Sequence, residues 1–306
     1  MKRIALVTTR DCDAAGLLQV MERLSRGGPL RLGLFSLEPG LTDSQMRLME
    51  GLAAMGATTS AVASVTADCL HDLDAELVIV QCDPAIGGPR RREQDLRRDL
   101  SRHSARPVWI MNGHTGPPAS VTALIDPDRD DSTDPALAAE ILRVSFTLAR
   151  ALDVPLDILN VWYFLEEGLL RSRRIRMPEQ EITERRRRAA WIAQSYFARL
   201  VARLPPDLAW RRLAHVQGPV LDAAVANMPE DTLVVAGSEG RDGWAARLRP
   251  NLAEDLCDRR RMGIVIVRRP DNASQRSSDH IAPDIGPSDG TDQSDTEGPN
   301  RQRNLA

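Results

Sequence analysis

Two glycines follow an apolar, strand-like run in the second half of the sequence, within VVAGSEGRDGWAARLRPN from Val234 to Asn251. Gly237 and Gly240 come directly after the apolar residues, and glycines in that position let a backbone approach a ligand, often a phosphate. About ten residues later, Pro250 and Asn251 open a predicted helix, whose free N–H groups and positive end favour an anion. The chemistry that this stretch predicts is phosphate binding by backbone N–H groups.

Two residues of the same stretch oppose phosphate binding. Pro250 lacks the N–H group that a phosphate would accept, although a proline costs nothing as a first helical residue. Glu239 places a carboxylate inside the loop, where it would repel a triphosphate. The hydroxyl of Ser238 and the amide of Asn251 could still donate hydrogen bonds. We interpret the loop as a weakened or vestigial nucleotide site rather than a working one.

An acidic run that follows another apolar segment begins like a calcium-binding loop. Asp126, Asp128 and Asp130 stand at alternate positions, but the expected glycine and glutamate are replaced by Asp131 and Leu137. The run is therefore predicted to be a solvated loop.

Neither the histidines nor the cysteines form a pattern that holds a metal or catalyses a reaction. No two histidines are spaced i, i+4, no C-x-x-C pair is present, and neither a G-x-S-x-G elbow nor a P-loop occurs. The residues concerned are His71, His103, His114, His215 and His280, with Cys12, Cys69, Cys82 and Cys257. The sequence thus predicts no metal site and gives no support to an enzyme.

Arginines gather in two clusters, one from Arg90 to Arg102 and one from Arg171 to Arg188. The second cluster contains eight arginines and three glutamates, enough locally to attract nucleic acid, nucleotides or an anionic lipid surface. Acidic residues interrupt both clusters, however, and no aromatic side chain is placed where bases could stack. We interpret both as solvated helix faces and expect neither nucleic acid nor a membrane as a partner.

Length and composition indicate a globular protein of two domains. The chain has 306 residues, 42% of them hydrophobic, and a formal net charge of −3. It contains no apolar run of 18 residues, and its first residues lead straight into a strand-like segment without a signal-peptide pattern. We expect a soluble, cytoplasmic protein.

Strand-like and helix-like segments alternate along both halves, which predicts a parallel sheet covered by helices on both faces. In the first half the expected strands are 4–8, 30–37, 58–65, 77–82 and 108–112, and the helices include 14–24 and 42–55. In the second half the expected strands are 121–125, 156–161, 210–216, 232–236 and 263–267. Its expected helices are 135–152, about 179–204, one from Val220 and one from about Asn251.

The second half resembles the universal stress protein family. VTALIDPD is similar to the family's first strand and its aspartate, HVQGPVLDAAVANMPEDTLVVAGSEGRDG to its third strand, helix and glycine loop, and MGIVIVRRP to its final strand. The first half is a weaker copy, in which ELVIVQCDP and SRHSARPVWIMN are similar to the end of such a domain. Together they resemble the tandem, or E-type, branch of the family.

The resemblance implies an α/β fold of two doubly wound, five-stranded, Rossmann-like domains in tandem. They would be a degenerate domain at residues 1–113, a linker at 114–120 and a universal stress protein domain at 121–270. The tail 271–306, rich in polar residues and nearly free of apolar ones, is predicted to be disordered. The final strands of the two halves are expected to pair across a pseudo-twofold axis within the chain, which lessens the need for a homodimer without forbidding one.

The resemblance also places a ligand. ATP-binding members carry G-x2-G-x9-G-(S/T), of which Gly237 and Gly240 keep the first part, while Pro250 and Asn251 stand where glycine and a hydroxyl residue are expected. The adenine and ribose would lie against Asp126, Pro127 and Val161. ATP is therefore the implied cofactor, although Pro250 and Glu239 are unfavourable for its binding. In the first half, Gly87 and Gly88 lack the spacing, so no nucleotide is expected there.

Two functions follow as hypotheses. The first is a cytoplasmic, non-enzymatic stress-response protein with a vestigial nucleotide pocket, acting through a protein partner. The alternative is a nucleotide switch that binds and slowly hydrolyses ATP through the loop of Gly237 and Gly240.

Overall fold

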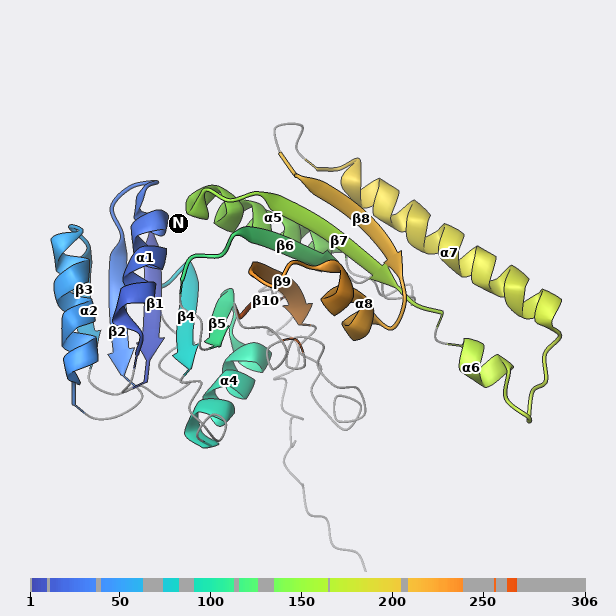
Figure 1. Ribbon diagram of the computed structural model, residues 1–306, viewed down its shortest axis with the longest axis horizontal. Coiled ribbons are helices and arrows are strands. Elements are labelled where there is room, and N and C mark those ends of the chain that lie inside the picture. The colour runs from blue at the N-terminus through green and yellow to red at the C-terminus, as the bar shows by residue number, and fades with distance from the viewer. Residues whose placement is uncertain are drawn as a thin grey trace, which may run out of the picture. The chain divides into compact units, whose positions relative to one another are not determined.

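Ten strands form a single sheet that has helices on both faces (Figure 1). The computed structural model describes residues 2–9, 12–36, 40–62, 74–82, 91–112, 116–125, 135–164, 166–204, 209–238, 256 and 263–268. The strands of the first half are β1 (Arg3–Thr8), β2 (Arg31–Ser36), β3 (Thr58–Val62), β4 (Leu77–Cys82) and β5 (Val108–Asn112). Those of the second half are β6 (Ser120–Ile125), β7 (Leu156–Trp162), β8 (Arg212–Gln217), β9 (Thr232–Ser238) and β10 (Ile264–Arg268).

The order of the strands is the same in the two halves of the sheet. Across the sheet it runs β3-β2-β1-β4-β5-β10-β9-β6-β7-β8. Counted outward from the middle, both halves place their strands in the order fifth, fourth, first, second and third. Neighbouring strands are parallel everywhere except between β5 and β10, which are antiparallel. There Ile264 pairs with Ile110 and Ile266 with Val108. The two final strands that the sequence analysis expects to meet are thus direct neighbours, at what we call the seam.

The helices divide between the two faces of the sheet. One face is covered by α1 (Ala14–Ser25), α2 (Asp43–Ala54), α5 (Pro135–Leu152) and α7 (Glu179–Val201), and its core runs without interruption from β2 to β7. The other face carries α4 (Arg91–His103) and α8 (Val220–Asn227). A short helix, α6 (Glu167–Leu170), packs with the start of α7 in a small cluster of its own.

The core continues across the seam because helices of the two halves touch. α1 contacts α5, and Nη1 of Arg23 on α1 donates to the carbonyl oxygen of Leu152 on α5 at 3.4 Å. Arg26 lies 3.7 Å from the carboxylate of Asp153, just after α5. Residues 1–270 accordingly form one compact unit.

A buried glutamine connects the carboxyl ends of β1 and β2 by hydrogen bonds. Gln45 on α2 is fully buried, and its Nε2 donates to the hydroxyls of Thr8 and Ser36 at 3.0 and 3.2 Å and to the carbonyl of Thr9 at 3.3 Å. Its backbone N–H and side-chain carbonyl form a capping box with Thr42, which fixes the start of α2. The hydroxyls of Thr8 and Ser36, at the ends of these two strands, are therefore hydrogen-bonded to Gln45.

The sequence-based elements agree with the observed ones to within a few residues, with two notable differences. α6 is not predicted, because four residues are too few for a periodic signal. β9 continues to Ser238, two residues past the predicted end, because it remains paired with β10. The expected helix near Asn251 and the tail 271–306 lie outside the described residues, apart from Leu256.

Candidate functional site

The ends of three parallel strands lie side by side at the edge where the sequence analysis places a ligand. β9, β6 and β7 are consecutive in the sheet and run in the same direction. Doubly wound folds bind ligands at the carboxyl ends of such strands. Val161, Gly237 and Ser238 lie at this edge, on β7 and β9. Asp126, Pro127, Gly240 and Asn251, like Glu239 and Pro250, lie outside the described residues.

Gly237 belongs to the strand rather than to the loop after it. It pairs with Val267 of β10, and the face of its α-carbon lies against α5. A Cβ there would stand 2.9 Å from Cδ1 of Ile141 and 3.0 Å from Cδ2 of Leu137. Close packing of helix on strand thus explains this glycine, without a ligand.

The side chain of Val161 is part of the core. It is fully buried, in the cluster that contains Ala223 and Ala224 of α8. Only its backbone could therefore meet a ligand at this edge. Ser238 is the last residue of β9 and pairs with Arg268.

A buried amide and a histidine connect β6, β7 and β8 directly behind this edge. Asn160 on β7 is fully buried, and its Nδ2 donates to the carbonyl oxygen of Ile125 at 3.1 Å. Its Oδ1 lies 2.6 Å from Nδ1 of His215 on β8. Since an amide oxygen only accepts, Nδ1 of His215 carries the proton and donates.

Two aromatic rings enclose the imidazole of His215. The ring of Trp162 stacks on it with centroids 6.1 Å apart, and that of Phe197 on α7 with centroids 5.7 Å apart. Burial lowers the pKa of His215 below its ordinary value of 6.5. The neutral imidazole therefore holds Asn160, and through it the carbonyl at the end of β6.

From the sequence, His215 is considered only as a metal ligand, and Asn160 is not singled out. A signal was present, because LDILNVW has one amide among apolar residues and RLAHVQ has its histidine on the strand expected beside it. Recognising the pair would have required the register, in which Asn160 stands opposite His215.

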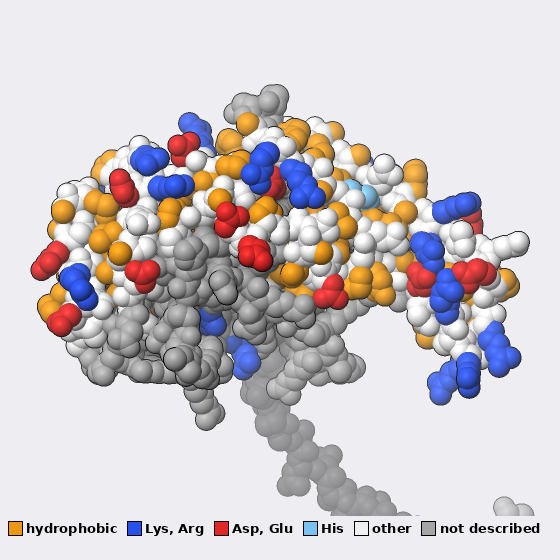
Figure 2. Space-filling view, viewed as in Figure 1, with side chains coloured by type: hydrophobic (Ala, Val, Ile, Leu, Met, Phe, Trp, Pro, Cys, Tyr) orange, Lys and Arg blue, Asp and Glu red, His pale blue; other side chains and the backbone are white. Residues whose placement is uncertain are grey.

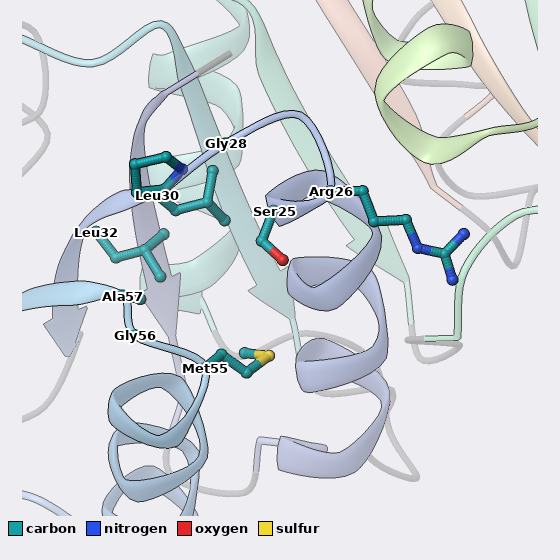
Figure 3. A pocket seen from close by; sticks show the side chains of 9 residues that line it. Ser25, Arg26, Gly28, Leu30, Leu32, Met55, Gly56 and Ala57 are labelled. Atoms are coloured by element: carbon teal, nitrogen blue, oxygen red, sulfur yellow. The ribbon is translucent and has the colours of Figure 1, made fainter.

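A cavity lies in the first half, at the end of the sheet where β2 begins. It has a volume of about 270 Å³ and lies where α1 and α2 end, against Leu30, which precedes β2, and Leu32 of β2. In Figure 3 the side chain of Arg26 points away from the other lining residues. The hydroxyl of Ser25 donates a hydrogen bond to the backbone carbonyl of Glu22 at 2.7 Å. With its charged and hydroxyl groups so engaged, this cavity is less suited to a ligand than the edge of β9, β6 and β7.

Several arginines of the Arg171–Arg188 cluster are held by glutamates. Glu167 on α6 accepts hydrogen bonds from Arg186 and Arg171, and these bonds lower the pKa of its carboxyl group. Arg171 also donates to Glu179. Basic and acidic side chains accordingly lie together at the end of the molecule formed by α6 and the start of α7 (Figure 2). A solvated helix face, as predicted, is found for the exposed residues Arg185, Arg187 and Arg188 of α7, whereas Arg173, Arg174 and Arg176 are exposed in the turn between α6 and α7.

Among the described residues, no group of three histidine, cysteine, aspartate or glutamate side chains could hold a metal ion. In the same part of the chain, no helix is both long enough and apolar enough to cross a membrane.

No protein-family model matches the sequence, and no curated protein matches it. Solved structures share its fold. A protein assigned as a universal stress protein in Pseudomonas aeruginosa UCBPP-PA14 has 18% identity and a TM-score of 0.62, over 88% of this chain and 94% of that one. A protein of unknown function from Pseudomonas aeruginosa PAO1 has 17% identity and a TM-score of 0.59, over 88% and 93%.

A universal stress protein from Archaeoglobus fulgidus has 12% identity and a TM-score of 0.53, over 88% of this chain and 97% of that one. The chain has the α/β fold of these proteins, with a mostly parallel sheet of ten strands. At these identities the likeness concerns the fold.

Proposed function

We propose that the chain is a universal stress protein of the tandem branch, with domains at 1–113 and 121–270 joined by the linker 114–120. The observation that carries this proposal is the repeated strand order on the two sides of the seam. It is supported by structural likenesses that extend over 88% of the chain, and so over both halves.

Its role is that of a non-enzymatic, cytoplasmic stress-response protein that acts by binding another protein. A non-catalytic role is supported by those polar groups near the carboxyl ends of the strands that bind one another in the part of the chain that the structure describes. Gln45 holds β1 and β2, and Asn160 with His215 holds β6, β7 and β8. A deletion strain of the source organism should survive starvation or oxidants less well, and the gene should restore its survival. Equal survival of the two strains under every stress tried would contradict this role.

The nucleotide pocket of the second half is weakened in this proposal. Gly237 is explained by packing against α5, and Pro250 and Glu239 remove one donor and add one repulsive charge. The second candidate, an ATP-binding switch, is favoured by the three adjacent strand ends and by the Gly237-to-Gly240 spacing.

ATP affinity separates the two candidates. The unaltered protein should carry no nucleotide when purified, by mass spectrometry, and should bind ATP with a Kd on the order of millimolar or weaker in calorimetry. The triple variant Glu239→Gly, Pro250→Gly, Asn251→Ser restores the donor N–H and hydroxyl and removes the repulsion. Its affinity should rise about tenfold or more per recovered contact. Micromolar binding by the unaltered protein, with no gain in the triple variant, would favour the switch.

A further inference from the structure

The side of α7 that faces away from the sheet carries two large apolar residues at its middle. Trp191 is 68% exposed and Ile192 is 50% exposed, whereas Ile182, Phe197 and Leu200 of the same helix are buried. At 3.6 residues per turn, Trp191 and Ile192 point away from that buried side. Single exposed apolar residues are common on proteins, but a tryptophan and an isoleucine together form the kind of centre that interfaces use.

Charges flank this apolar pair in a symmetric way. Glu184 stands seven residues before Trp191, and Arg199 stands seven residues after Ile192. Seven residues are close to two turns, so both lie on the outward stripe with the apolar pair. The side chain of Glu184 is 76% exposed, and its contact with Arg187, at 4.0 Å between two exposed groups, is weak. Arg199 is exposed, and among the described residues its side chain donates only to a backbone carbonyl within its own helix, that of Ser195.

The pattern is complementary to itself. If two α7 helices cross in antiparallel directions with Trp191 and Ile192 at the centre, Glu184 of each lies opposite Arg199 of the other. Arg188, which also lies on the stripe, then meets Ser195 rather than a like charge. A twofold axis repeats every contact, as an isologous interface requires.

We propose that the outward stripe of α7 is a self-association surface, on which a second copy of this chain docks with its α7 antiparallel. The apolar pair supplies the buried centre, and two Glu184–Arg199 ion pairs set the direction and the register. This surface is separate from the seam and from the edge of β9, β6 and β7, so it is independent of any nucleotide.

Charge reversal tests the proposal on the full chain. Sedimentation equilibrium at low salt should show a monomer–dimer equilibrium for the unaltered protein, with a Kd that rises with salt. Glu184→Arg and Arg199→Glu should each raise that Kd by about tenfold, because two attractive pairs become two repulsive ones. The double variant should regain the original Kd, and an equimolar mixture of the two single variants should form a heterodimer. Trp191→Ser with Ile192→Ser should abolish the dimer.

Arg47→Glu, a reversal on the exposed side of α2, is the matched control and should leave the Kd unchanged. Circular dichroism of each variant separates loss of association from loss of folding. If the unaltered protein stays monomeric at the highest concentration that sedimentation equilibrium can reach, the proposal is overturned. The proposal is also overturned if the Kd of the dimer is unchanged by both charge reversals, or if the two single variants fail to associate when mixed.

Discussion

Gly263 is the residue on which the seam depends most directly. Its φ is +80°, and a Cβ at this position would lie 1.9 Å from the carbonyl oxygen of Ile110 on β5. Backbone atoms cannot move aside as the end of a flexible side chain can. A glycine is therefore required where the chain enters β10.

Gly263→Ala is expected to lower the free energy of unfolding by about 3 kcal/mol or more, because strain at a positive φ adds to a clash with backbone. Gly56→Ala is the matched control, since Gly56 has a φ of +72° but nothing within 4 Å of the added carbon. It should cost about 1 kcal/mol, from the backbone strain alone. Urea denaturation followed by circular dichroism measures both. If the two variants lose the same free energy of unfolding, the backbone of β5 moves away from the added carbon at Gly263 without a loss of stability.

His215 makes the stability of the protein depend on pH. Because its pKa is lowered in the folded state, only the unfolded chain takes up a proton as the pH first falls below the ordinary value of 6.5. The contribution of His215 is therefore fully present above pH 6.5 and is lost as the pH falls towards the pKa of the folded state. His215→Gln cannot titrate.

The loss of stability caused by His215→Gln should accordingly be larger at pH 7.5 than at pH 5.5. Urea midpoints of both proteins at the two pH values measure it. If the difference in urea midpoint between the unaltered protein and the variant is the same at pH 7.5 and pH 5.5, the imidazole is not desolvated in the folded protein.

At the scale of elements, Gly237 joins β9 to α5. Gly237→Ala should lower the free energy of unfolding by about 1–3 kcal/mol through overpacking against Ile141 and Leu137. Ile141→Val removes the Cδ1 atom that lies 2.9 Å from the added carbon, and alone should cost about 1 kcal/mol. Combined, the two changes should cost less than the sum of their separate effects, because they relieve each other. Additive costs would show that the glycine serves something other than this contact.

The positions of most elements could be predicted from the sequence, because each half alternates apolar runs with amphipathic stretches. The capping box of Thr42 and Gln45 illustrates why helix starts were predictable, since capping depends on residues three apart. The candidate site was harder. The role of Gly237 depends on a helix about a hundred residues earlier in the chain, and the Asn160–His215 pair depends on strand register. Neither can be obtained from local spacing.

At the scale of the whole molecule, the shared sheet and the shared core predict that residues 1–270 unfold together. The fluorescence of Trp109, which is fully buried on β5 beside the seam, and the far-ultraviolet circular dichroism should report one coincident transition. Trp109→Phe identifies its part of the fluorescence signal. Two resolved transitions would mean that the halves are thermodynamically independent.

The antiparallel pairing of β5 with β10 takes place within one chain. Two separate chains would have to reach a concentration above their Kd to form such a contact, whereas β5 and β10 belong to one chain, so their pairing does not depend on the protein concentration. Dilution therefore does not dissociate the seam, and the ten-stranded sheet is complete even when a cell holds only a few copies of the protein. Its assembly is independent of how strongly the gene is expressed.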